Sequence, residues 1–276
     1  MVKVGSTYYL YGTAPGIAIK TSKDRTNFKS AGVAFPSGLP WCNNYTGSDR
    51  NIWAPEVRYV NSQFYLWYAC STFGTRKSAI FLATSSTGLS DSWTNKGKVY
   101  SSTTSSSFNS VDPALLMDDG KWYMTLGSFG TGIYQLQLDT STGLASSTSL
   151  SHLAERDGDQ SIEGASIFEH GSYYYMFVAF DFCCKGARST YRIMVGRSTS
   201  PTGGFIDNSG VSMLDGGGTE VLAGHGNYHG PGGASILSDG DGDDDDILVY
   251  HYYDAVGTAK LGINKLYWRD GWPTVV

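Results

Sequence analysis

The segment Val111-Asp112-Pro113-Ala114-Leu115-Leu116, followed by Gly120-Lys121-Trp122-Tyr123-Met124, indicates the fold because its pattern returns along the chain. Each copy combines a short motif, an apolar stretch, a turn and an aromatic strand. The other full copies begin at Trp53-Ala54-Pro55-Glu56, Ile162-Glu163-Gly164 and Gly230-Pro231-Gly232-Gly233, and a partial copy covers residues 5–11. Repetition over such distances is typical of propellers and solenoids.

Most copies are followed by a third run of apolar residues that ends in a polar turn. The run is clearest at residues 17–22, 80–85 and 193–198. Apolar and polar residues alternate in these short runs, and Gly, Asn and Asp separate them, which is a β pattern rather than a helical one. The sequence therefore predicts an all-β protein.

The length of the repeat decides between two all-β architectures that both contain many short strands. Asp112 and Glu163, which we place at matching positions of their copies, are 51 residues apart. Units of about 50 residues with three or four strands are propeller blades, whereas a β-sandwich predicts no such repeat. Five units predict a single five-bladed β-propeller domain over residues 1–276, with a first blade that lacks its start.

Composition limits the class of protein and its partners. Aromatic residues make up 14% of the 276 residues and charged residues only 16%, so the chain is not a disordered one. A net charge of -5 gives no basic footprint, which argues against a nucleic-acid partner. No apolar run approaches the length of a membrane-spanning helix, so we expect no membrane partner. We also expect a monomer.

The four cysteines do not form a disulfide scaffold or a zinc motif. Cys183 and Cys184 are adjacent, and two interpretations stay open for them: a vicinal disulfide in an oxidising compartment, or two small buried thiols. Cys42 and Cys70 stand alone in the sequence.

Two carboxylates share a place in the repeat. Asp112 and Glu163 each lie eight residues before the turn glycine of their copy, Gly120 and Gly171. Because the first strand of a propeller blade lines the central channel, we expect both to point into one pocket. Two facing carboxylates suit glycoside hydrolysis, and the many aromatic rings provide flat surfaces for sugars. The alternative is a pair of solvated turn carboxylates.

Motifs spread over the whole chain resemble glycoside hydrolase family 43, and within it the endo-1,5-α-L-arabinanases of fungal type. The motifs are the repeat starts, Ser71-Thr72-Phe73-Gly74, Gly127-Ser128-Phe129, Cys183-Cys184, Asp215-Gly216-Gly217-Gly218-Thr219, Gly224-His225-Gly226 and Asp270-Gly271-Trp272-Pro273. The resemblance implies a five-bladed propeller. It also implies a secreted hydrolase that cleaves α-1,5-L-arabinofuranosidic bonds in arabinan with inversion, using three acids.

The resemblance also implies a role for individual residues. Glu163 matches the general acid, and Asp112 matches the carboxylate that orients this acid and raises its pKa. The rings expected to hold arabinose are Trp53 and Phe73, and the polar contacts to substrate are Asn109 and Ser128. His225 matches a histidine that meets a calcium ion whose other ligands are water. Apart from the resemblance, His229 and His251 lie on or near inner strands of the last unit. Two interpretations stay open for them: they line the channel, or they are hydrogen-bonded structural residues.

The third acid, the general base, departs from the family pattern. The resemblance places it in a His-Asp-Pro motif of the first blade, and the register puts that slot before Met1. Loss of a general base typically costs 10² to 10⁴-fold in rate, so we expect impaired catalysis by the chain as written. Two interpretations keep the hydrolase: the sequence is trimmed and the base lies upstream of Met1, or a different residue acts as base. Three alternatives for the function also stay open: a non-catalytic arabinan-binding propeller, an exo-acting arabinofuranosidase or xylosidase of the same family, and a protein-binding scaffold propeller.

The acidic run at residues 239–246 resembles a calcium-binding loop. An EF-hand loop needs glycine at its sixth position and an acid at its twelfth, and here these positions hold Asp244 and Tyr250. We therefore interpret the run as a solvated hairpin turn of the last unit.

Overall fold

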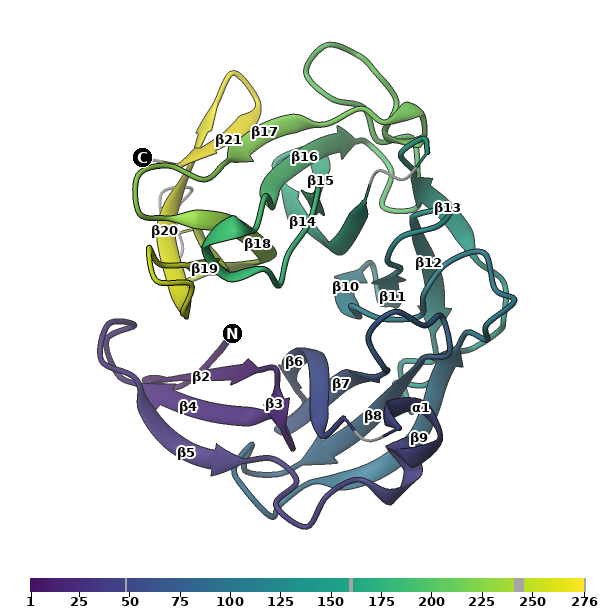
Figure 1. Ribbon diagram of the computed structural model, residues 1–276, viewed down its shortest axis with the longest axis vertical. Helices are drawn as coiled ribbons and strands as arrows, with labels where there is room; N and C mark the ends of the chain where they lie inside the picture. The colour runs from purple at the N-terminus through teal and green to yellow at the C-terminus, as the bar shows by residue number, and fades with distance from the viewer. Residues whose placement is uncertain (48, 159–160, 241–245, 276) are drawn as a thin grey trace. The chain divides into compact units, whose positions relative to one another are not determined.

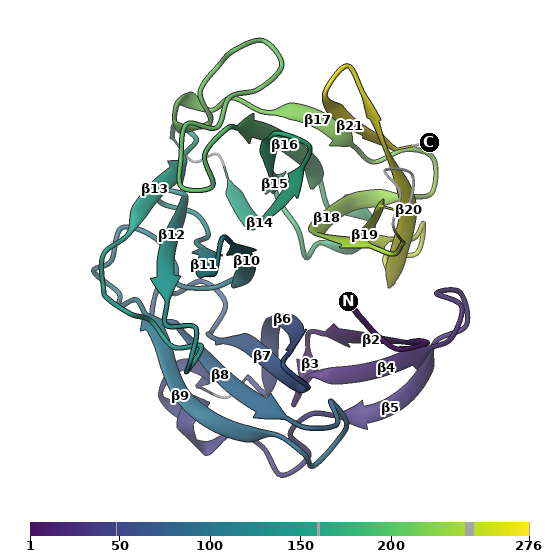
Figure 2. The ribbon, with the colours of Figure 1, turned by 180° about the vertical axis from the view of Figure 1, so that it is seen from behind.

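The computed structural model describes residues 1–47, 49–158, 161–240 and 246–275. In this part of the chain the strands form four four-stranded sheets and one five-stranded sheet, which Figures 1 and 2 draw as arrows. The chain divides into two compact units. Unit 1 consists of Met1–Gly127 and Leu136–Ser149, and unit 2 of Ser128–Gln135 and Leu150–Val276.

Unit 1 contains two whole sheets and the first hairpin of a third. The first sheet has the order β1(Val2–Val4), β2(Thr7–Gly12), β4(Ala18–Ser22), β5(Lys29–Val33). The second has the order β3(Ala14–Pro15), β6(Asn51–Val60), β7(Gln63–Cys70), β8(Ala79–Ser85), β9(Thr94–Ser101). Two short helical segments precede β6, namely η1(Pro40–Cys42) and α1(Asn43–Thr46), and the further hairpin is β10(Ala114–Asp118) with β11(Lys121–Leu126).

The third sheet continues as β12(Ile133–Leu138) and β13(Ser151–Ala154), and the boundary between the units falls within β12. Unit 2 holds two further sheets. One has the order β14(Ile162–His170), β15(Tyr173–Phe180), β16(Arg192–Ser198), β17(Thr219–Leu222). The other has the order β18(His229–Ser238), β19(Asp246–Tyr253), β20(Ala259–Arg269), β21(Trp272–Val275). The short helices η2(Gly186–Arg188) and η3(Met213–Asp215) lie in loops of this unit.

The hairpins that the repeats predicted are present. The four full copies form the antiparallel pairs β6–β7, β10–β11, β14–β15 and β18–β19, and the partial copy forms β1–β2. The third runs form β4, β8 and β16, each paired with the second strand of the preceding hairpin. The acidic run falls between β18 and β19, and residues 241–245 of it lie outside the described residues.

Alternation along the strands builds a separate apolar core in each unit. Leu66 and Tyr68, two residues apart on β7, share a buried cluster with Ile17 of unit 1. Tyr175 and Phe177 of β15 share one in unit 2. Alternate residues of a strand point to the same face, and burying each large apolar side chain stabilises the fold by about 1.5–3 kcal/mol.

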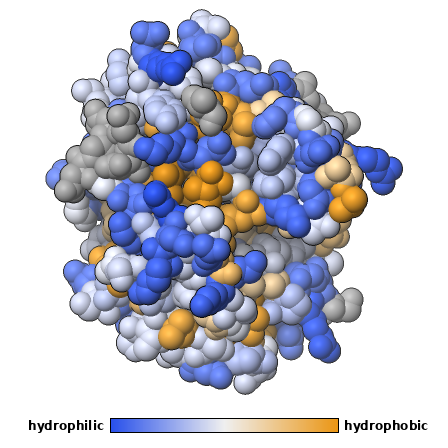
Figure 3. Space-filling model, turned by 90° about the vertical axis from the view of Figure 1, so that its left-hand side faces the viewer, coloured by the Kyte–Doolittle hydropathy of each residue, from blue (hydrophilic) through white to orange (hydrophobic). Residues whose placement is uncertain are grey.

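None of the helices in the described part of the chain has the length and apolar character that a membrane crossing requires. Figure 3 shows one face of the molecule, where hydrophilic side chains are most common and apolar ones form small groups between them.

Two disulfides are formed. Cys42 of η1 is bonded to Cys70, the last residue of β7. The sequence did not predict this pairing, because it depends on how the segment before β6 folds back onto β7. The second disulfide joins Cys183 to Cys184, so the structure contains the vicinal bond rather than two thiols.

We expect removal of the Cys42–Cys70 disulfide to destabilise the protein. The bond closes a loop of 28 residues, and loop closure of this size lowers the entropy of the unfolded chain by an amount worth ~3–4 kcal/mol. The double variant C42A/C70A should show this loss in urea-induced unfolding. The matched control is C183A/C184A. The vicinal disulfide joins neighbouring residues and closes no loop, so its removal should lower the free energy of unfolding much less. Equal losses in the two variants would contradict the loop-closure explanation.

Candidate active site

The carboxyl group of Glu163 lies near the start of β14 and is held at both of its oxygens. The residue is 8% exposed. Ser128 Oγ donates to Oε2 at 2.5 Å, and the Tyr191 hydroxyl donates to Oε1. A buried carboxyl group with a hydrogen bond at each oxygen has a fixed orientation, as proton transfer to a substrate requires.

The backbone around Glu163 brings these groups together. Ser128 forms an isolated antiparallel bridge with Glu163, and the N–H of Phe129 donates to the carbonyl oxygen of Ile162 at 3.2 Å. β14 then bulges between Glu163 and Ser166, where Gly164 has a φ of 62°. Glycine adopts this left-handed conformation without strain, and such a bulge changes the course of the strand directly after Glu163.

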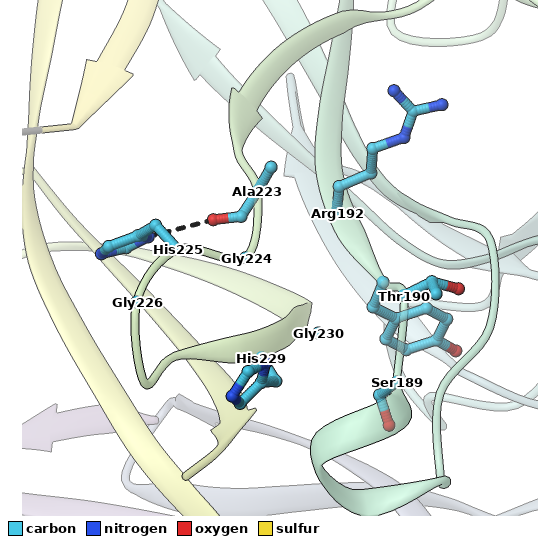
Figure 4. Close-up of a pocket in the computed structure, with 10 residues that line it drawn as sticks. Ser189, Thr190, Arg192, Ala223, Gly224, His225, Gly226, His229 and Gly230 are labelled. Atoms are coloured by element: carbon cyan, nitrogen blue, oxygen red, sulfur yellow. Dashed lines mark hydrogen bonds between the residues drawn. The ribbon is translucent and has the colours of Figure 1, made fainter. Parts of the chain in front are cut away.

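Tyr191 links this carboxyl group to a pocket of about 370 Å³, because Tyr191 lines the pocket and its hydroxyl contacts Glu163, which is not itself a lining residue. Its walls come from residues 189–192 and from the segment 223–230 (Figure 4). His225 and His229 contribute imidazoles, and Arg192 contributes a guanidinium group that pairs with Asp181 at 2.9 Å. The pocket is thus lined by polar groups that suit a hydroxyl-rich ligand.

His229 and His251 differ in their surroundings. His229 lines the pocket. His251, opposite Gly232 in the β18–β19 register, has a buried Nε2 with no hydrogen-bond partner among the described residues. Burial lowers the pKa of His251 to about 4, so its ring is neutral at ordinary pH.

The residues around His225 do not by themselves fit calcium. His225 Nδ1 lies 3.1 Å from the carbonyl oxygen of Ala223, and its ring stacks on Tyr228. Calcium takes six to eight oxygen ligands, whereas His225 offers one nitrogen. The described residues contain no group of three or more His, Cys, Asp or Glu side chains that could hold a metal ion. A calcium ion with water ligands near His225 stays a prediction.

Asp112, in unit 1, lies just before β10 and is half-buried, with a φ of 56°. Its place in the repeat is one residue later than we expected. Counted back from the end of its strand, Ala114 of β10 matches Ser166 of β14. Two residues earlier, Asp112 therefore matches Gly164 and not Glu163. The turn glycines misled the count: Gly120 is the second residue of its turn, whereas Gly171 is the first of its own.

Trp53 and Phe73, both in unit 1, are brought together as a pair of rings. Their ring centroids are 6.4 Å apart in an edge-to-face arrangement. Phe73 is 78% exposed, which is unusual for such an apolar side chain and leaves its surface open to a ligand. Their contact with arabinose stays a prediction.

Asn109, also in unit 1, is fixed by a chain of serine hydroxyls. Ser78 Oγ donates to Asn109 Oδ1, and Ser78 Oγ lies 2.7 Å from Ser71 Oγ. Its backbone carbonyl accepts from the N–H of Val111 at 3.0 Å. The amide of Asn109 therefore has a set orientation next to the segment that carries Asp112.

The profile of the family "Glycosyl hydrolases family 43" matches residues 1–273. The chain belongs to glycosyl hydrolases family 43. Among its family 43 relatives is an extracellular endo-α-(1→5)-L-arabinanase of Bacillus subtilis, 39% identical over 99% of this chain and 85% of the relative. Another is a probable arabinan endo-1,5-α-L-arabinosidase A of Aspergillus flavus, 37% identical over 98% of this chain and 86% of the relative.

Solved family 43 structures are similar over nearly the whole chain. An endo-arabinanase of Bacillus licheniformis is 40% identical with a TM-score of 0.91, over 99% of this chain and 94% of that one. A Cellvibrio cellulosa arabinanase with bound arabinohexaose has 33% identity and a TM-score of 0.93, over 100% and 93%. An exo-1,5-α-L-arabinanase from a bovine ruminal library has 33% identity and a TM-score of 0.92, over 100% and 95%. The predicted five-bladed β-propeller is confirmed as the fold class.

Three aromatic residues of unit 2 were given no role from the sequence. Tyr191 reaches the Glu163 carboxyl group, and Phe129 and Phe182 form a ring pair with centroids 6.2 Å apart. Phe129 has a φ of 53° and is 42% exposed, an uncommon conformation for a bulky residue. The motif Gly127-Ser128-Phe129 carried a signal for Phe129, but nothing in the sequence around Tyr191 pointed to Glu163.

Proposed function

We propose that this protein is a secreted glycoside hydrolase that cleaves α-1,5-linked L-arabinofuranosyl bonds within arabinan, with inversion at the anomeric carbon. The observation that carries the proposal is the buried Glu163 carboxyl, held by two hydroxyl groups beside a polar pocket. Membership of family 43 and the names of its relatives supply the substrate.

In the proposed reaction Glu163 gives a proton to the leaving glycosidic oxygen, and the bond from that oxygen to the anomeric carbon breaks. A water molecule activated by a general base attacks from the opposite face of the sugar. Asp112 orients the acid, as the resemblance implies. The resemblance assigns the base to a His-Asp-Pro motif of the first blade, whose slot in the register falls before Met1. The mechanism contains no step that uses calcium.

The test is digestion of linear debranched arabinan, followed by both viscosity and reducing-sugar release. Cleavage inside the polymer lowers the viscosity while few reducing ends have formed, and it produces a ladder of oligosaccharides. Binding of arabino-oligosaccharide without any release of reducing sugar would replace the proposal by the non-catalytic binding protein.

Exo action is the second candidate, favoured by the similarity to the ruminal exo-arabinanase. The same digestion separates the two. An exo enzyme releases one short product from the start and leaves the viscosity high until late in the reaction.

We expect Phe73 to bind a sugar ring. With 78% of its surface exposed, covering the ring by a sugar should gain roughly 1.4 kcal/mol or more, which corresponds to a factor of about ten. F73A should therefore raise KM for arabinan about tenfold with little change in kcat or in unfolding stability. M117A is the control, because Met117 is another exposed apolar residue of unit 1, at 45%. An unchanged KM in F73A would remove Phe73 from the binding surface.

Secretion agrees with the two disulfides, since such bonds persist in oxidising compartments. The name of the Bacillus subtilis relative includes the word extracellular. We propose that the protein acts as a monomer on a soluble polysaccharide, with no nucleic-acid or membrane partner.

A further inference from the structure

Tyr191 contacts the one oxygen of Glu163 that Ser128 does not. We propose that Tyr191 is a positioning residue that decides which oxygen of the Glu163 carboxyl carries the transferable proton. This inference rests on the proposed function, in which Glu163 is the general acid. Tyr191 is 6% exposed and its hydroxyl donates to Glu163 Oε1.

The hydrogen-bonding capacity of a protonated carboxyl group differs between its two oxygens. Such a group has one oxygen that only accepts and one O–H that donates. Both hydroxyls can donate or accept, but a phenol is a stronger donor and a weaker acceptor than an alcohol. Tyr191 therefore keeps donating to Oε1 when the group is protonated, and the proton belongs on Oε2. Ser128 Oγ, next to Oε2, has one donor and two acceptor sites, so it accommodates either protonation state of Oε2.

The two hydroxyls therefore have different tasks during the reaction. The proton moves from Oε2 to the glycosidic oxygen, and the electron pair of the broken C–O bond stays on that oxygen. Glu163 is left as a carboxylate, which accepts one hydrogen bond from Tyr191 and one from Ser128. Tyr191 donates to Oε1 both before and after transfer, and more strongly to the carboxylate than to the neutral acid. The carboxyl group therefore does not have to rotate.

The position of the Tyr191 ring is fixed by a glycine on β18. A Cβ atom at Gly232 would lie 2.3 Å from Cδ2 of Tyr191, so the ring lies directly against the Gly232 backbone. On β19, the His251 ring lies 6.0 Å from the Tyr191 ring, centroid to centroid. Because burial keeps His251 neutral, it adds no positive charge that would favour the carboxylate form of the acid.

The first test measures the Glu163 carboxyl directly and needs no activity. The chain contains five glutamates, so ¹³C labelling of glutamate gives few carboxyl signals, and E163Q identifies the relevant one. In Y191F the midpoint of this signal should move to higher pH, because a hydrogen bond donated to the carboxylate is lost. Y175F is the matched control: it also removes a tyrosine hydroxyl hydrogen bond, to the carbonyl of Gly271 at 2.7 Å, and should leave the midpoint in place.

The second test is kinetic and compares leaving groups. Y191F should lower kcat on arabinan roughly 10- to 100-fold, the range for a hydrogen bond to a charged group, with KM nearly unchanged. On an aryl arabinooligoside with a 2,4-dinitrophenyl leaving group, which departs without an acid, the loss should nearly vanish. G232A, which displaces the ring but keeps the hydroxyl, should show the same selectivity to a smaller extent.

An unmoved carboxyl midpoint in Y191F would overturn the inference, as would equal kinetic losses on both substrates, since a purely structural defect affects all substrates alike. These failures are distinct from a failure of the proposed function. Suppose that the unsubstituted protein cleaves arabinan but E163Q loses the same rate on arabinan and on the dinitrophenyl substrate. Glu163 is then not the general acid, and the inference about Tyr191 fails as well. If E163Q loses more rate on arabinan than on the dinitrophenyl substrate but Y191F loses the same on both, Glu163 remains the acid and only the inference about Tyr191 fails.

Discussion

The variant E163Q is expected to lower kcat on linear arabinan by about 10² to 10⁴-fold, the usual contribution of a general acid. Glutamine keeps the size of the side chain and can still accept from the Tyr191 hydroxyl and meet Ser128, the two groups that hold the carboxyl. What it lacks is the proton that the leaving oxygen needs. The loss should therefore fall on catalysis rather than on folding or substrate binding.

The measurement is the initial rate of reducing-sugar release, with arabino-oligosaccharide binding followed by calorimetry in the same samples. E169Q is the control, since Glu169 is an exposed carboxylate on the same strand, β14, and should keep the full rate. If E163Q retains more than about a tenth of the activity, another group protonates the leaving oxygen.

Adding an amino-terminal segment that contains His-Asp-Pro is expected to raise the rate on arabinan by about 10² to 10⁴-fold. The reason is that inversion needs a carboxylate that removes a proton from the attacking water, and the register places this carboxylate before β1. The measurement is again reducing-sugar release from linear arabinan, for proteins of equal concentration and equal thermal stability.

A second extension that carries His-Asn-Pro separates the chemistry from the folding. It has the same length and the same strand propensity but no carboxylate. Equal gains from the two extensions would show that the added strand, and not the base, restores activity. Full activity without either extension would assign the base to a residue within the chain.

Local patterns in the sequence predicted the fold well. Each repeat contains its own turn and the two strands beside it, so the hairpins β6–β7 and β14–β15 could be placed from short segments alone. The register of Asp112 was harder, since it depended on the exact position of one glycine in a two-residue turn. Gly120 and Gly171 differ in that position, and the predicted match was off by one residue.

The site was predicted only where the motifs mark it. Glu163 and Ser128 were chosen from the sequence, and the structure brings them together. Tyr191 and the Cys42–Cys70 pair were not predicted, because their contacts join segments 28 residues apart in the chain. Such contacts depend on which strands pair and on where the loops between them lie in the folded chain. Neither the spacing of residues nor the composition determines these positions.

The left-handed kink at the start of the inner strands has a consequence for engineering. It occurs at Ala54, Asp112, Gly164 and Gly233, with φ of 44°, 56°, 62° and 64°. Only glycine adopts this conformation freely, and other residues carry roughly 1–2 kcal/mol of strain. Replacing Ala54 by glycine relieves strain at a residue without a functional group. At Asp112 the same change removes a candidate catalytic carboxylate. Ala54 is therefore the position to change for a more stable enzyme, and Asp112 is the one to keep.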